Sequence, residues 1–226
     1  MPLPFLVHMS AGALAIVIGF AVLFSPKGGS LHRRGGLAFV ASMLVLALSG
    51  AAIAAWLGDV GTVVGGLLAS YLTVTALVTV KPVSAGWRRA LVGATCVGVL
   101  VASVSATRAV MSIGRTSAVV GYLVFGTVAA LAVRGDLAIL RGAVLRGAPR
   151  LRRHVWRACI ALWFATASFF LGPRRRVEKV LPDALISSTT VIIPVALVII
   201  VMLYWLWRLR SRTALRGMVL GGKTTP

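Results

Sequence analysis

Long apolar blocks separated by short basic clusters run along nearly the whole chain of 226 residues. Each block is about 20 residues long, the length that an α-helix needs to cross the hydrocarbon core of a bilayer. The blocks are rich in Leu and Ala and lack the short apolar–polar alternation of transmembrane β-strands. We therefore expect an all-α polytopic membrane helix bundle with seven transmembrane helices. The predicted spans are residues 4–24, 34–57, 60–80, 88–106, 116–133, 154–171 and 184–207.

The pattern predicts a single transmembrane helical domain over residues 1–215, followed by a flexible C-terminal tail over 216–226. The longest non-spanning stretch is 136–149. It reads either as an interfacial helix or as an extension of the fifth span, with Pro149 ending it.

The basic clusters predict the orientation of the bundle. Four clusters, each following an odd-numbered span, hold 18 of the 24 Lys and Arg residues. Because cytoplasmic loops of membrane proteins carry an excess of Lys and Arg, we expect the N-terminus outside and the C-terminus inside. The natural location is a bacterial inner (cytoplasmic) membrane. One run, Arg174–Arg176, falls on the predicted outer side and is partly balanced by Glu178 and Asp183.

Composition agrees with this interpretation. Hydrophobic residues make up 59% of the chain, the mean hydropathy is +0.97 and the net charge is +20. In a soluble protein that charge would suggest nucleic acid, but here topology and contact with anionic lipids explain it, and we expect no nucleic-acid partner. Arg150, Arg152 and Arg157 are the candidate contacts for lipid phosphate or another anion.

The sequence lacks the residues that several classes of membrane protein and enzyme require. No acidic residue is predicted deep inside a helix, which argues against proton-coupled transport. No span carries a central Lys for a retinal Schiff base, and no Ser, His and Asp cluster suggests a hydrolase. The sequence therefore leaves open whether the protein is an enzyme.

Histidines offer the one candidate cofactor site. The predicted topology places His32 and His154 at the same membrane depth on different helices, as in b-type cytochromes, so the pair is a candidate for ligating haem b. Arg33 and Arg153 lie beside them and could neutralise haem propionates. The alternative is that each His caps a helix or meets lipid phosphate. His8, near the opposite face, is either a buried hydrogen-bonded residue or a functional ionisable group.

These features leave two functional hypotheses. The first is a haem-binding or redox-associated membrane protein. The second is a non-enzymatic channel, carrier or membrane-complex assembly partner with a polar path along Thr73, Thr75 and Thr79, although such hydroxyls commonly bond back to their own helix. Gly61 and Gly65 form a GxxxG pattern that serves either packing within the bundle or association into a homo-oligomer or with a membrane partner protein.

The first 60 residues carry a family resemblance. Their motifs are His8-Met-Ser-Ala-Gly12 continuing to Gly19, and Leu31-His-Arg-Arg-Gly35 at the entry to the second span. In these motifs, and in a later His154 followed by Arg157, the chain resembles the bacterial membrane-protein family catalogued as domain of unknown function 2306. The resemblance implies a helical membrane architecture and candidate residues. It implies no particular reaction.

Overall fold

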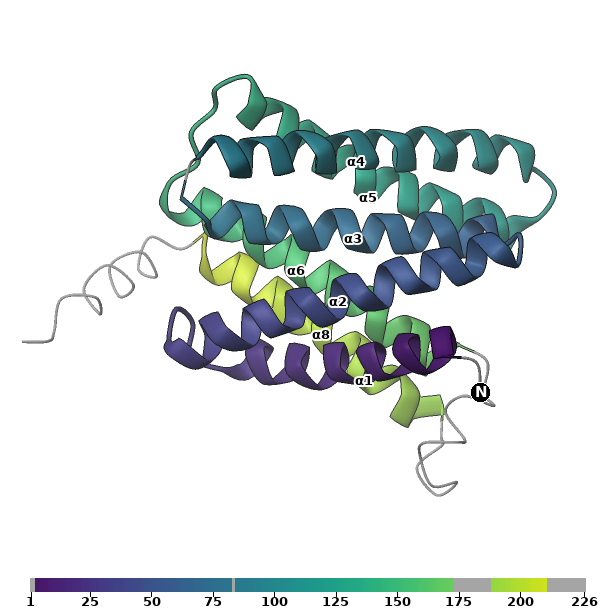
Figure 1. Ribbon diagram of the computed structural model, residues 1–226, viewed down its shortest axis with the longest axis horizontal. Helices are drawn as coiled ribbons and strands as arrows, with labels where there is room; N and C mark the ends of the chain where they lie inside the picture. Colours follow the sequence, from purple (N-terminus) through teal and green to yellow (C-terminus); the bar gives the residue numbers. More distant parts are fainter. Residues whose placement is uncertain (1–2, 83, 173–187, 211–226) are drawn as a thin grey trace, which may run out of the picture.

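The described part of the chain forms seven α-helices that run side by side in an up-and-down bundle (Figure 1). The structure is a computed structural model that describes residues 3–82, 84–172 and 188–210. The helices are α1 (Leu3–Phe24), α2 (Ser30–Trp56), α3 (Val60–Val80), α4 (Ala85–Met111), α5 (Thr116–Leu140), α6 (Gly147–Phe170) and α8 (Ser188–Arg208). No β-strand occurs in these ranges, so the all-α prediction is confirmed for them.

Six of the seven described helices are long and apolar enough to cross a membrane, as expected for a multi-pass integral membrane protein. The exception is α6, whose first half carries four arginines, including Arg150 and Arg157. Charges in this half lower its hydropathy below that of a typical span. Three features stay predictions: the count of seven spans, the orientation of the termini and the tail after residue 215. The tail and Arg174–Arg176 lie outside the described residues.

The structure differs from the sequence prediction around the 136–149 stretch. Helix α5 continues to Leu140, so the start of the 136–149 stretch extends the fifth helix. Pro149 does not end a helix but lies in the first turn of α6, which begins at Gly147. A proline is tolerated there because the first N–H groups of a helix have no partner within the helix.

Helix α3 lies at the centre of the bundle. It packs against α2, α4 and α6, while α6 packs in turn against α8, and α4 against α5. Small residues bring these helices close. A Cβ atom on Gly66 would lie 2.6 Å from the Ala47 carbonyl oxygen of α2, and one on Gly98 of α4 would lie 2.6 Å from the Tyr71 ring of α3. The core therefore depends on glycine at two helix crossings.

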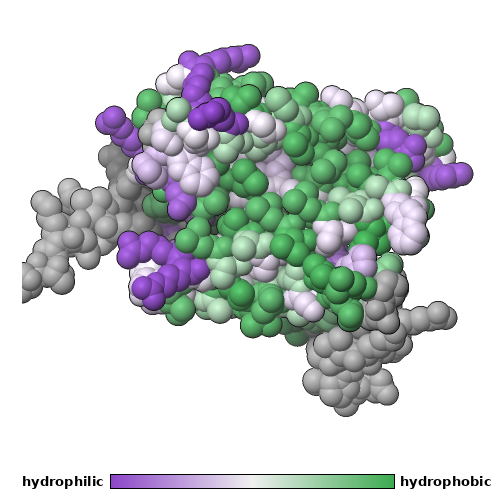
Figure 2. Space-filling view, in the orientation of Figure 1, coloured by the Kyte–Doolittle hydropathy of each residue, from purple (hydrophilic) through white to green (hydrophobic). Residues whose placement is uncertain are grey.

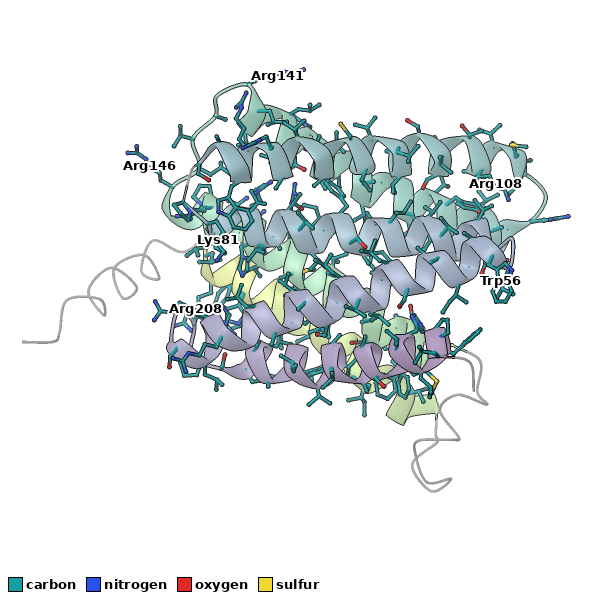
Figure 3. All side chains as sticks on the ribbon, viewed as in Figure 1. Trp56, Lys81, Arg108, Arg141, Arg146 and Arg208 are labelled. Atoms are coloured by element: carbon teal, nitrogen blue, oxygen red, sulfur yellow. The ribbon has the colours of Figure 1, made fainter. Side chains whose placement is uncertain are left out.

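Polar and apolar residues divide along the bundle. Hydrophobic residues cover the middle of the face seen in Figure 2, and hydrophilic residues gather towards the ends. Lys81, Arg141, Arg146 and Arg208 lie at one end, here called the basic end, and Arg108 lies at the other (Figure 3).

The basic end also holds the carboxyl ends of α1, α3, α5 and α8. Lys27 contacts one of these helix ends. Its ammonium group donates to the Val22 carbonyl at 3.1 Å and the Leu23 carbonyl at 2.5 Å. Cations there meet both the unpaired carbonyls and the negative ends of the helix dipoles.

Candidate functional site

Two arginines of α6 point into the bundle. Arg153, Arg157, Ala161 and Ala165 are spaced four residues apart, which places them in one stripe along the helix. All four are buried, with 7% of Arg153 and 1% of Arg157 exposed. The alanines let α6 approach its neighbours, and the two guanidinium groups reach towards α5 from the same face.

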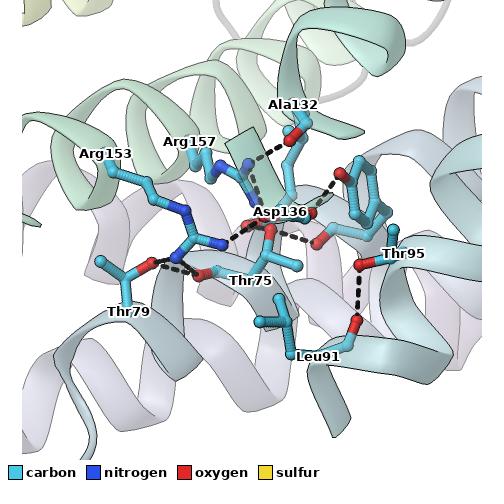
Figure 4. A network of polar contacts seen from close by, with 10 residues as sticks. Thr75, Thr79, Leu91, Thr95, Ala132, Asp136, Arg153 and Arg157 are labelled. Atoms are coloured by element: carbon cyan, nitrogen blue, oxygen red, sulfur yellow. Dashed lines mark hydrogen bonds and ion pairs between the residues drawn. The ribbon is translucent and has the colours of Figure 1, made fainter. Parts of the chain in front are cut away.

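Asp136 of α5 receives both arginines. It is fully buried and lies on the same helical face as Ala129, Ala132 and Val133. Its Oδ1 accepts a hydrogen bond from Arg153 and forms an ion pair with Nη2 of Arg157 at 2.8 Å (Figure 4). Charge-assisted hydrogen bonds of this kind are among the strongest polar contacts in proteins.

Helix α3 completes this cluster. The Tyr71 hydroxyl donates to Oδ2 of Asp136 at 2.5 Å, so both carboxylate oxygens are engaged. Arg153 also donates to the Thr79 hydroxyl and, at 3.4 Å, to the Thr75 carbonyl. The buried ion cluster, meaning Asp136, Arg153 and Arg157 with Tyr71 as a neutral donor, thus ties α3, α5 and α6 together.

The buried ion cluster is incomplete in charge and in hydrogen bonds. Two guanidinium groups face one carboxylate, which leaves one net positive charge. Nη2 of Arg157 forms the ion pair with Asp136 and donates to the Ala132 carbonyl at 2.6 Å. Its Nη1 and Nε, and Nε of Arg153, are buried without a hydrogen-bond partner among the described residues. Burying charged donors without hydrogen bonds costs free energy. A negatively charged acceptor would therefore stabilise this cluster.

A cavity of about 690 Å³ opens beside the two arginines. The cavity lies over α6, between α5 and α8. Helix α5 packs on α4 and α3, whereas α8 packs on α6, so α5 and α8 leave a space between them. Its lining comprises Leu131, Gly135, Ala138, Ile139, Ala143, Leu145, Pro149, Arg152, Arg153, Trp156, Arg157, Leu203, Leu206, Trp207 and Arg210. The exposed Arg152 and Arg210 form its rim, and the buried Arg153 and Arg157 form its inner wall. We call this space the basic cavity.

The predicted anion contacts separate into three environments. Arg152 is exposed at the rim of the basic cavity. Arg150 instead caps α3, because its Nε donates to the Thr79 carbonyl at 2.6 Å and its Nη2 to the Lys81 carbonyl at 3.1 Å. Arg157 lies inside the bundle, so surface contact with lipid does not fit its burial.

The candidate haem ligands lie at the basic end but away from the cavity lining. Nδ1 of His154 lies 3.0 Å from the Ala76 carbonyl, and Nδ1 of His32 lies 3.4 Å from the Val22 carbonyl. Arg33, the other predicted propionate partner, is exposed on α2. The described residues contain no group of three or more His, Cys, Asp or Glu placed to hold a metal ion.

His8 lies between α1 and α2, far along the chain from the other two histidines. Its Nδ1 is 3.1 Å from both the Leu46 carbonyl and the Ser49 hydroxyl. Gly50 leaves room for the ring, since a Cβ there would lie 2.8 Å from its Cε1 atom. His8 is therefore hydrogen-bonded and half-buried, and a functional role for it stays a prediction.

The prediction that no acidic residue lies deep inside a helix missed Asp136, which is fully buried near the end of α5. Asp136 follows Arg134 and Gly135 and reads as the start of a polar loop, yet α5 continues past it. A signal was present, because Asp136 continues the small-residue face of Ala129, Ala132 and Val133 at helical spacing. The argument against proton-coupled transport loses its premise with this finding.

Comparisons with known proteins give no relatives. No protein-family model, no curated protein and no solved structure matches the chain. The resemblance to the domain of unknown function 2306 family thus stays a prediction, and the function must be argued from the site itself.

Proposed function

We propose that this chain is a bacterial inner-membrane protein that binds an anionic amphiphile in the basic cavity, as a carrier or as a lipid-dependent partner in a membrane complex. The observation that carries the proposal is the lining of the cavity. Arg153 and Arg157 line its inner wall with N–H donors that have no partner in the described chain, and Arg152 stands at its rim.

The walls of the basic cavity indicate an amphiphile rather than a small inorganic anion. Leu131 and Ile139 of α5 face Leu203 and Leu206 of α8 across it. An acyl chain would bury against these walls, while its headgroup reaches the guanidinium groups. Anionic lipids are the most abundant molecules of this chemistry at the cytoplasmic face of a membrane.

The threonines of α3 do not favour a polar channel. Thr73, Thr75 and Thr79 donate to the carbonyls of Ala69, Tyr71 and Thr75 at 2.7, 2.8 and 2.6 Å. These hydroxyls are satisfied within their own helix, as Ser and Thr commonly are in apolar helices. A binding function at the basic cavity is better supported than a path along α3.

Blocking the cavity without changing its charge tests the proposal. Gly135 lines the cavity, and a Cβ there would meet only Nη2 of Arg157, at 3.6 Å. Gly135→Leu should place its side chain in the cavity and remove copurified anionic lipid from native mass spectra. Gly121→Leu is the matched control, because Gly121 lies on the same helix with nothing within 4 Å of its Cβ position. Equal lipid retention by both variants would refute the proposal.

Haem ligation by His32 and His154 is a second candidate, favoured by one observation. Nδ1 of each ring lies near a backbone carbonyl, at 3.0 Å for His154 and 3.4 Å for His32, so a proton on Nδ1 would leave Nε2 with its lone pair. Metal-ligating histidines typically make this contact. Haem, if bound, would be held by His32 and His154 through Nε2 and would supply electron transfer.

An absorption spectrum tests the haem candidate. Protein produced with haem available should show the spectrum of a six-coordinate low-spin iron, and His32→Ala or His154→Ala should each abolish it. His8→Ala should leave it unchanged. A folded preparation without Soret absorbance would remove this candidate and leave the lipid-binding proposal intact.

A further inference from the structure

The unbalanced charge of the buried ion cluster specifies the ligand further. We infer that the headgroup that enters the basic cavity bears a single negative charge, a carboxylate or a phosphate diester, and completes the cluster of Asp136, Arg153 and Arg157. This inference rests on the proposed function, since it names the chemistry of the ligand at the same site.

The first argument is the arrangement of donors. Nη2 of Arg157 is already used by Asp136 and the Ala132 carbonyl. Nη1 and Nε of the same guanidinium have no hydrogen-bond partner in the described chain, although the group lies over the Trp156 and Tyr71 rings and the side chain is only 1% exposed. Because Arg157 also lines the basic cavity, a ligand there can supply the acceptor once the side chains around these buried atoms shift. Oxygen atoms of carboxylates and phosphates are the acceptors that guanidinium groups bind best.

The second argument is the number of charges. With Asp136 ionised and both arginines protonated, a neutral ligand leaves a net charge of +1 in the interior, and a ligand with two negative charges leaves −1. A singly charged headgroup leaves none. Since uncompensated charge is expensive in a low-dielectric site, the cluster should select the single charge. Arg152 and Arg210 at the rim are exposed, so solvent screens their contribution to this selection.

The third argument is access. Trp156 and Trp207 line the basic cavity together with the rim and inner arginines, and their indole rings suit the boundary between headgroup and acyl chain. Because Arg152 and Arg210 line the same space as Arg153 and Arg157, a headgroup attracted at the rim can reach the inner arginines within one cavity. The same route serves a fatty-acid carboxylate and the phosphodiester of a phospholipid, so the ligands tested must distinguish these two sources.

A charge series of variants tests the inference. The full-length protein is placed in phosphatidylcholine nanodiscs, and binding of phosphatidylglycerol, oleate and phosphatidic acid is measured at pH 8. A phosphate monoester such as phosphatidic acid then carries nearly two negative charges. Wild type should prefer phosphatidylglycerol or oleate, and whichever binds identifies the source. Arg157→Gln makes the cluster neutral and should weaken that binding at least about tenfold, the loss expected for one charged hydrogen bond.

The remaining variants change the charge of the cluster or serve as a control outside the cavity. Asp136→Asn raises the cluster to +2 and should shift the preference to phosphatidic acid. Should that variant fail to fold, the dependence on cluster charge is tested by Arg153→Gln instead, which neutralises the cluster as Arg157→Gln does and should weaken binding to the same extent. Arg146→Gln removes an exposed charge outside the cavity lining and should bind like wild type.

The outcomes separate the two claims. A wild-type protein that binds no anionic lipid would refute the proposed function. Binding that is unchanged in Arg157→Gln, or a wild type that prefers phosphatidic acid, would refute the single-charge inference and leave lipid binding standing.

Discussion

At the residue scale, Asp136 is the residue on which the stability of the contact between α3, α5 and α6 depends. Its fully buried carboxylate accepts hydrogen bonds from Arg153 and Tyr71 and forms an ion pair with Arg157. Buried ion pairs add little stability compared with apolar packing, but breaking one leaves a charge without compensation. Loss of the Asp136 carboxylate would therefore leave Arg153 and Arg157 buried without a counter-ion and lower the stability of the fold.

Asp136→Asn should destabilise the protein by about 3–5 kcal/mol, because both arginines stay buried without their counter-ion. Asp59→Asn is the matched control, since Asp59 is an exposed N-cap of α3 and Asn caps equally well. The melting temperature followed by tryptophan fluorescence in detergent compares the two. Equal melting temperatures would show that the buried ion cluster contributes nothing to stability.

Arg150 has a different role from its neighbours and a different expected effect. Its guanidinium caps carbonyls at the end of α3, so Arg150→Gln should cost about 1–2 kcal/mol through the lost hydrogen bonds and helix-dipole contact. Bound anionic lipid should be retained, because Arg150 does not line the basic cavity. Loss of lipid with unchanged stability would reverse this assignment and return Arg150 to the lipid contacts.

At the element scale, the crossing of α3 and α4 positions Tyr71 for its bond to Asp136. The ring lies against Gly98, where a Cβ atom would be 2.6 Å from Cζ of Tyr71 and 2.8 Å from Val133. Real side chains do not approach so closely, so any larger residue at 98 must move the ring or separate the helices. The glycine in α4 thus supports a contact made between α3 and α5.

Gly98→Ala should destabilise the protein by about 1–3 kcal/mol through this overpacking. Gly93→Ala on the same helix meets nothing within 4 Å and should be neutral or stabilise by up to about 1 kcal/mol, because alanine favours helix more than glycine. Denaturation of both variants in one detergent checks the difference. A Gly98→Ala variant as stable as Gly93→Ala would mean that α3 and α4 are not packed this closely.

The elements were predictable from sequence where apolar length alone defines them. Helices α1 and α3 match the predicted spans within about a residue at each end, since both are uninterrupted apolar runs. Helix α6 begins seven residues before the predicted start at His154, because its arginine-rich first half looks like a loop. Sequence reasoning treats charge as a sign of solvent, and here the charges are buried by pairing between helices.

The site was only partly predictable for the same reason. Arg152, Arg153 and Arg157 were recognisable as anion-binding candidates from their density on one segment. Their partner Asp136 was not, since pairing across 17 and 21 residues depends on how α5 and α6 fold together. Only the helical spacing of Asp136 with Ala132 pointed inward.

At the scale of the whole molecule, the bundle has one strongly basic end. Lys81, Arg141, Arg146 and Arg208 lie there together with the rim of the basic cavity (Figure 3). If this end faces the cytoplasm, the cavity opens into the leaflet where anionic headgroups are concentrated. The orientation of the bundle and the identity of its ligand are therefore linked.

Reporter fusions at the C-terminus test the orientation. A reporter active only in the cytoplasm should be active there, and one active only in the periplasm should be silent, because α8 ends at the basic end. Replacing exposed basic residues with Gln should weaken this bias in proportion to the charge removed. Activity of the periplasmic reporter would reverse the orientation and move the basic cavity away from the cytoplasmic leaflet.

The most direct test of the central claim is an experimental structure of the full chain in nanodiscs that contain a singly charged anionic lipid. The account predicts an elongated density in the basic cavity between α5 and α8, with its headgroup within hydrogen-bond distance of Nη1 or Nε of Arg157. A cavity that holds only water, or an Arg157 whose remaining N–H groups are satisfied by the protein itself, would contradict it.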